Sequence, residues 1–398
     1  MKILSNDYLA NVPGSARVAH GGPANFARNF SAFAINAGHE WIGLILRTTK
    51  AKTMRMQTIA VMPTCRYIDY FLPEAPLARL FKIKKKVDPR IYFSAEVQRL
   101  RRFIRETEPD LLFLNGYSVY SWLLLEAAAR EGLPIVIQHA GIACIEYKIY
   151  QHLYTDAARE ILLEMERDIV RQASKQIFLN EYSRQVFSKQ VSRLRKHQSI
   201  VIPLPYEIKE WEQAARKKPR RIEKREVVIG CVARWDRIKN HAAVLDLARA
   251  AHKQGLPWRF ESVTTIPPTK LFRQFKEEYR QRIKVLPLMD RAALAKFYGR
   301  MDVLILPSHF DVSPTVVMEA AGAGKPTLIS STVGWVTEYA ACELQKWVVD
   351  FTRPELVIKR LMQLLDQPFP HTFQTFLRRH HAPEKVFHAY LQLFTDVL

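Results

Sequence analysis

The feature that most constrains the fold is a regular alternation of short apolar runs with helix-length segments. Residues 23–37 have apolar side chains at helical spacing, and Gly38 follows as a helix stop. Five apolar runs in the first half predict strands, at residues 1–4, 40–46, 110–114, 134–138 and 176–179. This alternation predicts an α/β fold in which parallel strands form a sheet covered by helices on both faces.

The alternation stops at residues 207–224, which are basic and interrupted by proline, and then begins again. Four further apolar runs predict strands, at residues 227–232, 258–263, 283–286 and 303–306. We therefore expect two doubly wound domains, residues 1–205 and 206–382, followed by an amphipathic helix at 383–398. Ligands of such sheets bind at the carboxyl ends of the strands, so the functional site is expected there.

Composition limits the class of protein. The chain has 398 residues, of which 48% are hydrophobic and 11% aromatic, which excludes a disordered chain. There are 60 Lys and Arg residues against 39 Asp and Glu residues, a net charge of +21. This excess indicates a polyanionic partner, which could be nucleic acid, anionic lipid or a phosphorylated ligand. A recognised nucleic-acid-binding motif is missing, so we expect no nucleic acid.

The cysteines and the apolar runs indicate a location. Cys65, Cys144, Cys231 and Cys342 are far apart and form no CxxC pair, which argues against a zinc site and a disulfide framework. Such a pattern fits a reducing compartment. No run approaches 18 apolar residues, as a membrane span would require. We expect a cytoplasmic protein, which could also rest on the inner face of a membrane.

The stretch at residues 303–338 contains two acidic residues beside a predicted helix start. Ser313 is expected as the N-cap and Pro314 as the first helical residue. Free N–H groups at a helix start bind phosphate, and ionised carboxylates accept hydrogen bonds from sugar hydroxyls. Asp311 and Glu319 would then bind sugars on either side of that phosphate. The alternative is that Asp311 caps a turn and Glu319 is a solvated helix residue.

The stretch at residues 228–240 is a strand followed by a basic loop. Arg234, Arg237 and Lys239 lie in this loop, just past the strand end, where they would neutralise a diphosphate. The alternative is a solvated basic loop in a basic protein.

Two features of the first half are weaker. Gly21 and Gly22 precede a predicted helix and would allow close approach of a ligand to the backbone, although glycine pairs often only form turns. His139 follows the strand at 134–138, where it would line a cleft. A single histidine is more often structural than catalytic.

Taken together, these stretches resemble retaining glycosyltransferases of family 4, the glycosyl transferases group 1. The resemblance runs over nearly the whole chain. It rests on the Gly-Gly loop with GHE at 38–40, QHAG at 138–141, residues 166–187, VARWDRIKN at 232–240, DVSPTVVMEAAGAGKPTLIS at 311–330, and VGWVTEY at 333–339. It implies the GT-B fold, with two Rossmann-like domains facing across a cleft and a C-terminal helix that crosses back to the first domain. The first domain would bind the acceptor and the second the nucleotide-sugar.

The resemblance also assigns roles to individual residues. It implies that Arg234 and Lys239 hold the donor diphosphate, that Asp311 contacts the transferred sugar, and that Glu319 binds the ribose. His139 would lie at the reacting centre. The backbone around Ser313, Thr315 and Val316 would bind the sugar and the distal phosphate, and Gly21 and Gly22 would face donor or acceptor. No metal and no cofactor is implied, and the donor would be a UDP- or GDP-sugar.

This sequence departs from the family pattern in four places. Asp311 is shorter than the usual Glu, and Pro314 removes one N–H group. PLPY at 203–206 replaces the usual Asn-Gly turn, and ESVTTIPP at 261–268 replaces an expected Gly-x-Gly. These departures affect donor identity more than activity. The implied function is a retaining, metal-independent glycosyltransferase acting on a glycan or lipid-linked acceptor, in cell-envelope polysaccharide or glycolipid synthesis. The alternative is a catalytically silent GT-B protein that binds a sugar nucleotide or glycan.

A basic segment in the first domain could contact a membrane. Phe81–Arg105 mixes Lys and Arg with aromatic and aliphatic residues at helical spacing, which suits an anionic membrane surface. The alternative is a solvated helix face.

Overall fold

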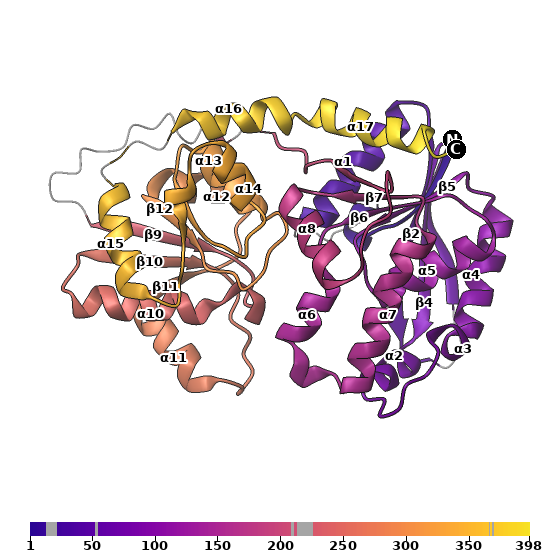
Figure 1. Ribbon diagram of the computed structural model, residues 1–398, viewed down its shortest axis with the longest axis horizontal. Coiled ribbons are helices and arrows are strands. Elements are labelled where there is room, and N and C mark those ends of the chain that lie inside the picture. The colour runs from indigo at the N-terminus through magenta and orange to yellow at the C-terminus, as the bar shows by residue number, and fades with distance from the viewer. Residues whose placement is uncertain (13–21, 52–54, 208–210, 213–225, 366, 368–369) are drawn as a thin grey trace. The chain divides into compact units, whose positions relative to one another are not determined.

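The computed structural model describes residues 1–12, 22–51, 55–207, 211–212, 226–365, 367 and 370–398. The chain forms two compact units (Figure 1). The first unit consists of residues 1–205 together with 384–398, and the second unit of residues 206–383. Most of the predicted linker at 207–224 lies outside the described residues, as does Gly21.

The first unit is built on a sheet whose eight described strands have the order β3-β4-β2-β1-β5-β6-β7-β8. Their bounds are β1 Lys2–Asn6, β2 Glu40–Thr49, β3 Arg55–Met62, β4 Cys65–Pro73, β5 Leu111–Asn115, β6 Ile135–His139, β7 Lys175–Phe178 and β8 Ser199–Val201. Neighbouring strands are parallel except β3 and β4, which are antiparallel. The expectation of a wholly parallel sheet is therefore wrong at this edge, since β3 and β4 are joined by a tight turn and were missed in the sequence.

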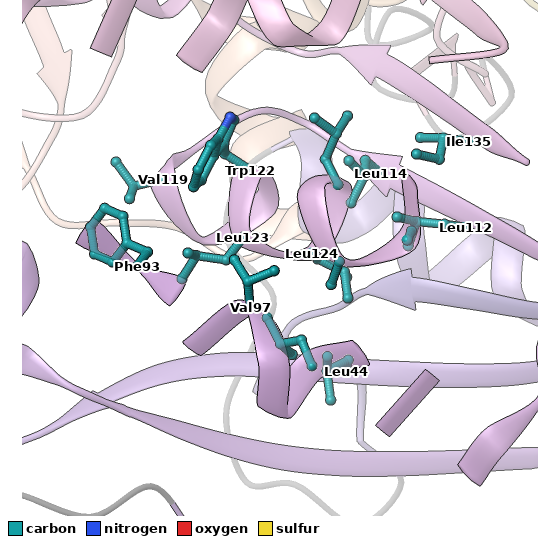
Figure 2. Close-up of a cluster of buried hydrophobic side chains, with 14 of the residues drawn as sticks. Leu44, Phe93, Val97, Leu112, Leu114, Val119, Trp122, Leu123, Leu124 and Ile135 are labelled. Carbon is teal, nitrogen blue, oxygen red and sulfur yellow. The ribbon is translucent and has the colours of Figure 1, made fainter. Parts of the chain in front are cut away.

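Helices cover this sheet and supply most of its core. Their bounds are α1 Gly22–Asn36, α2 Glu74–Phe81, α3 Pro89–Tyr92, α4 Ser94–Thr107, α5 Val119–Arg130, α6 Ala143–Ile149, α7 Asp156–Gln172 and α8 Glu181–Gln190, with short 3-10 turns at Leu9–Asn11 and Gln151–Leu153. Figure 2 shows part of the core, where Trp122, Leu123 and Leu124 of α5 lie with apolar side chains of α4 and β5. Burial of these side chains away from water is the main force that holds the helices on the sheet.

The C-terminal helix α17 (Pro383–Thr395) packs on the first unit, as expected. Its aromatic side chains meet those of α1 and β5. The ring centroids of Tyr390 and Phe26 are 5.0 Å apart, and those of Phe394 and Phe113 are 5.1 Å apart. The Tyr390 hydroxyl also donates to Oε1 of Gln138 at the end of β6. Helix α17 is thus part of the hydrophobic core of the first unit.

The second unit has a sheet whose six described strands are all parallel, in the order β11-β10-β9-β12-β13-β14. The strand bounds are β9 Val227–Val232, β10 Trp258–Val263, β11 Ile283–Leu286, β12 Val303–Leu306, β13 Thr327–Ser330 and β14 Val348–Val349. The helices are α10 His241–Lys253, α11 Arg273–Arg282, α12 Arg291–Arg300, α13 Thr315–Gly322, α14 Val336–Ala341, α15 Pro354–Leu365 and α16 His371–His380, with 3-10 turns at Arg237–Lys239 and Gln345–Trp347. This doubly wound arrangement confirms the α/β prediction.

One glycine determines how closely a helix packs on this sheet. A Cβ at Gly230 in β9 would lie 2.6 Å from Sδ of Met301 and 3.2 Å from the Phe297 ring, both at the end of α12. Only glycine leaves room for this contact. The close approach fixes α12, whose Tyr298 contributes to the site described next.

Candidate functional site

The site lies where the strand order of the second sheet reverses. Strand β9 has β10 on one side and β12 on the other, so the connections after β9 and β12 run to opposite sides. In open α/β sheets, ligands bind outside the carboxyl ends of the strands at such a point. The two loops that leave here, residues 233–240 and 307–314, contain most of the residues predicted to bind the donor.

The loop after β9 is held in place by hydrogen bonds to its own residues and to the loop after β12. The Asp236 carboxylate accepts from the Ile238 N–H at 3.2 Å, which caps the turn that carries Lys239. The side-chain amide of Asn240 donates to the Pro307 carbonyl at 3.1 Å. The His309 N–H donates to the Ile238 carbonyl at 2.8 Å. The two loops therefore form one connected structure.

The Lys239 ammonium forms an ion pair with the Asp311 carboxylate. The side chains are only 17% and 15% exposed, so little water screens the pair. The structure thus brings together two residues that lie far apart in the sequence and were predicted to contact neighbouring parts of one donor. The alternative in which Asp311 only caps a turn does not account for this pairing.

The backbone of Asp311 is also fixed from a second direction. Its N–H donates to the Thr332 carbonyl at 3.3 Å, and its carbonyl accepts from the Gly334 N–H at 2.8 Å. The indole N–H of Trp335 donates to the Pro314 carbonyl at 3.1 Å. The loop after β13 therefore holds both Asp311 and Pro314, the residue just before α13. Sequence analysis did not assign a role to Trp335.

Helix α13 begins at Thr315, with Pro314 as the N-cap residue, and no side chain caps it. The prediction of Ser313 as the N-cap and Pro314 as the first helical residue is therefore wrong by one position. The first N–H groups of any helix have no acceptor within the helix, and they carry a partial positive charge. Ser313, Thr315 and Val316 are all partly exposed, so this end of α13 is accessible.

Glu319 is partly exposed, but its carboxylate has a protein partner, so it is not simply a solvated helix residue. The Tyr298 hydroxyl of α12 donates to its carboxylate at 2.7 Å. Burial raises the pKa of Glu319, while hydrogen bonds from Tyr298 and Thr315 oppose that rise. The carboxylate is thus held in one orientation with acceptor capacity left for a ligand hydroxyl. Tyr298 lies 21 positions before Glu319, and no pattern in the sequence links the two residues.

Arg234 differs from Lys239 in being largely unrestrained. Its side chain is 76% exposed, and its guanidinium is 3.8 Å from the Asp236 carboxylate. Its backbone carbonyl accepts from Nε2 of the buried His241 at 2.9 Å. The position of Arg234 is therefore fixed at the backbone while the side chain can move toward a ligand.

Two buried hydroxyl groups flank the end of β9. Among the described residues, Oγ of Ser308 and Oγ1 of Thr264 have no hydrogen-bond partner, although each residue is only 1% exposed. Ser308 follows β12 and Thr264 follows β10, on either side of β9. A buried hydroxyl without a partner costs free energy, and a bound polar ligand would relieve that cost. Neither residue stood out in the sequence.

His139, the last residue of β6, is fully buried in the first unit. Its ring stacks on Phe178 with centroids 4.4 Å apart, and its Nε2 is 3.1 Å from Oε1 of Gln176. Burial lowers its pKa to about 4, so the ring is neutral at neutral pH. This environment favours the structural interpretation. The assignment of His139 to the reacting centre stays a prediction.

Gly22 is the first residue of α1, and its neighbour Gly21 lies outside the described residues. The start of α1 is held by a side-chain amide, since Nδ2 of Asn115 at the end of β5 donates to the Pro23 carbonyl at 2.8 Å. The role of this glycine pair in binding donor or acceptor also stays a prediction.

The basic segment Phe81–Arg105 packs most of its apolar residues against the core of the first unit. Phe93, Val97 and Leu100 are buried there, whereas Ile91 is 74% exposed. The four lysines are exposed, at positions 82, 84, 85 and 86. Contact of this segment with a membrane stays a prediction. No helix within the described residues is long and apolar enough to span a membrane.

Comparisons with known proteins bear on the family and the fold of the chain. Residues 212–379 match the model of the family described as glycosyl transferases group 1. A putative glycosyltransferase, EpsF of Bacillus subtilis, is 33% identical over 110 residues, which are 27% of this chain and 28% of EpsF. The matched stretch thus spans under a third of that relative.

Solved structures resemble the chain over its whole length. Sucrose-phosphate synthase from Thermosynechococcus elongatus has a TM-score of 0.73 at 16% identity, covering 100% of this chain and 99% of that one. Trehalose-6-phosphate synthase of E. coli, bound with UDP-2-fluoro glucose, has a TM-score of 0.70 at 13% identity, covering 100% and 99%. At this identity the likeness establishes the fold, which is GT-B.

Proposed function

The chain belongs, through residues 212–379, to the glycosyl transferases group 1 family, and on that basis we propose that it is a retaining glycosyltransferase. It transfers a sugar from a nucleotide-sugar, a UDP- or GDP-sugar, to a glycan or lipid-linked acceptor. The reaction uses no metal ion and no cofactor. The described residues contain no group of three or more His, Cys, Asp or Glu side chains placed to hold a metal.

The observation that carries the proposal is the ion pair of Lys239 and Asp311 close to the start of α13. A leaving diphosphate needs positive charge, which the Lys239 ammonium and the free N–H groups of α13 supply. A transferred sugar needs hydrogen-bond acceptors, which the Asp311 carboxylate supplies. Both requirements are met at the one place in the sheet where a ligand is expected.

The remaining donor contacts follow from the same geometry. Glu319 accepts from the ribose hydroxyls, with the Tyr298 hydroxyl holding its carboxylate. The exposed Arg234 closes on the diphosphate, where guanidinium can bind phosphate oxygens in pairs. Ser308 and Thr264 offer hydroxyl groups that lack partners in the free protein.

In the proposed reaction, the bond between the anomeric carbon and the phosphate oxygen breaks. A bond between an acceptor hydroxyl oxygen and the same carbon forms on the same face of the sugar. The acceptor proton passes to the departing phosphate oxygen. Lys239 and the helix N-terminus stabilise the charge on the diphosphate as it leaves, and Asp311 orients the sugar during this step.

Two relatives guide the choice of substrates to test. The E. coli synthase structure contains a UDP-sugar analogue, so UDP-sugars are the first donors to try. EpsF is named a putative glycosyltransferase, and its similarity to this chain over 110 residues supports a polysaccharide or glycolipid acceptor. The basic surface of Lys82, Lys84, Lys85 and Lys86 would attract such an acceptor when it is anionic or lies in an anionic membrane.

Thermal shift with UDP-, GDP- and ADP-sugars, followed by donor hydrolysis without acceptor, tests the proposal. A ligand present at about 100 times its dissociation constant adds roughly 2.7 kcal/mol to the free energy of unfolding. We expect one donor class to raise the melting temperature and to be hydrolysed slowly by the wild type, with hydrolysis lost in Asp311→Asn. Binding without any hydrolysis would indicate instead a catalytically silent sugar-nucleotide-binding protein.

A further inference from the structure

The loop before α11 in the second unit exposes two adjacent large apolar side chains. Leu271 is 70% exposed and Phe272 is 78% exposed, the latter being the highest value for a large apolar residue in the described part of the chain. Single exposed apolar residues are common on protein surfaces. Two neighbours at the tip of one loop are not explained by packing within this unit.

The backbone at Phe272 makes this exposure more unusual. Phe272 has a φ of +54°, in the left-handed region that bulky residues rarely adopt. A strained residue persists only when the surrounding structure holds it or when its position serves a function. The Phe272 ring is exposed to solvent, so no burial of the ring offsets the cost of this backbone conformation.

A buried lysine holds the loop in this conformation. Lys276 is only 4% exposed, and its ammonium donates to the carbonyls of Pro267 and Thr269 at 3.0 and 2.9 Å and to the Thr269 hydroxyl at 2.9 Å. Burial of an ammonium is costly unless it is fully hydrogen-bonded. The three acceptors satisfy it, and in return it fixes the segment that leads to the exposed pair.

Basic residues surround the apolar tip. Lys270 and Arg273 lie on either side of the pair, and both are exposed. Residues 270–284 contain six basic and two acidic residues. In Figure 1, α11 and the segment leading into it extend away from the sheet of the second unit. An apolar tip with basic flanks matches a surface that is apolar inside and anionic outside, which describes an anionic lipid bilayer.

We propose that Leu271 and Phe272 insert into the interfacial region of an anionic membrane, with Lys270 and Arg273 contacting the headgroups. This surface differs from Phe81–Arg105, most of whose apolar residues pack against the core of the first unit. The loop leaves the sheet at the carboxyl end of β10, next to β9, whose end carries the proposed donor site. Docking the tip therefore brings the donor-binding edge of the second unit to the membrane, where a lipid-linked acceptor would be found.

Vesicle sedimentation of the full chain, without any donor, tests this inference independently of the proposed activity. The wild type should bind vesicles of phosphatidylglycerol and phosphatidylcholine, and bind phosphatidylcholine alone much less. Phe272→Asn and Leu271→Ser should each weaken binding by about tenfold, because each removes an apolar side chain from the bilayer. Leu356→Ser, which changes a 54% exposed leucine on α15, is the matched control and should bind like the wild type.

The melting temperature supplies a second readout. Asn tolerates the left-handed region better than Phe, so Phe272→Asn should leave the melting temperature unchanged or raise it while vesicle binding falls. This pattern is expected if Phe272 serves membrane binding at a cost in stability. If Phe272 had only a structural role, its replacement would lower the melting temperature.

Three results would overturn the inference. The first is wild-type affinity of Phe272→Asn for the anionic vesicles. The second is loss of all binding in a variant with Gln at Lys82, Lys84, Lys85 and Lys86 while Phe272→Asn has no effect, which would place the contact on the first unit. The third is self-association of the wild type that Phe272→Asn abolishes, which would identify a second copy of the chain as the occupant of the tip.

Discussion

The ammonium of Lys239 and the carboxylate of Asp311 form an ion pair that joins the loop after β9 to the loop after β12. Because both side chains are mostly buried, each group depends on the other for its charge partner in the free protein. A donor diphosphate would compete with Asp311 for Lys239. Donor binding is therefore expected to release the Asp311 carboxylate toward the sugar. The contact of the diphosphate with Lys239 would then make Asp311 available to bind the sugar.

Lys239→Ala and Arg234→Ala should both weaken donor binding, but only the first should destabilise the free protein. Loss of a charge-assisted contact to the diphosphate is worth on the order of 1.5–3 kcal/mol, or roughly tenfold to hundredfold in affinity. Lys239→Ala also leaves Asp311 without its partner, which should cost about 1–3 kcal/mol of unfolding free energy. The Arg234 side chain is 76% exposed, so Arg234→Ala should not measurably change the free energy of unfolding. Calorimetry and urea denaturation measure the two effects. Equal stability of the two variants would argue against the ion pair.

Asp311→Asn should lower turnover more than donor affinity. The neutral amide still occupies the position, but it cannot match a carboxylate as an acceptor for sugar hydroxyls when the glycosidic bond breaks. Single-turnover kinetics with saturating donor, compared with donor binding by calorimetry, separate the two quantities. If the variant loses only affinity, Asp311 binds the donor without acting in the chemical step.

Donor affinity should fall as the pH is lowered through the raised pKa of Glu319. The protonated carboxyl group is a poorer acceptor for the ribose hydroxyls. The Tyr298 hydroxyl lowers this pKa, so Tyr298→Phe should raise it and shift the loss of affinity to higher pH. Glu319→Gln should bind weakly at every pH, which makes it the control. Calorimetric titrations across the acid range measure the midpoint, and identical midpoints in wild type and Tyr298→Phe would contradict the assignment.

His139→Phe should change the pH dependence of stability. The pKa of His139 falls from 6.5 to about 4 on folding, so the unfolded chain binds a proton first as the pH drops. The wild type should therefore lose up to about 3 kcal/mol of unfolding free energy between pH 6.5 and 4 from this residue alone. His139→Phe lacks that component, and denaturation at both pH values measures it.

The same variant decides the role of His139. Because its ring contacts Phe178, Phe187 and Gln176 in the core, we expect His139→Phe to retain turnover at neutral pH. Complete loss of turnover in a variant with wild-type stability would place His139 at the reacting centre.

The fold could be predicted well from the sequence because buried parallel strands appear in it as continuous apolar runs. All five residues of β5 are buried, and the run is visible without any other information. The edge strand β3 was missed because it has no fully buried residue and its apolar residues 59–62 follow a polar half, so it lacks the pattern of a buried strand. Its partner β4 reads as a mixture of charged and aromatic residues, although six of its residues are buried in the sheet next to β2.

The site was predicted in part. Residue types in the loops after β9 and β12 indicated a phosphate and sugar site, which is a local property of the sequence. The contact of Lys239 with Asp311 spans 72 positions, and the contact of Tyr298 with Glu319 joins two different helices. Such contacts depend on how the sheet orders its strands, and residue spacing does not contain that order. For Phe81–Arg105 the sequence left two interpretations open, because a helix face that points to the core and one that points to a membrane have the same pattern.

Helix α17 completes the core of a unit whose other residues are synthesised much earlier. On the ribosome, residues 1–205 emerge well before residues 384–398 are synthesised, so Phe26 and Phe30 of α1 lack their contacts with Tyr390 and Phe387 during that time. Transiently exposed apolar surface of this kind promotes aggregation and recruits chaperones. A stop codon before residue 384 would therefore damage the first unit, and residues 1–205 expressed as a continuous fragment would lack a piece of their own core.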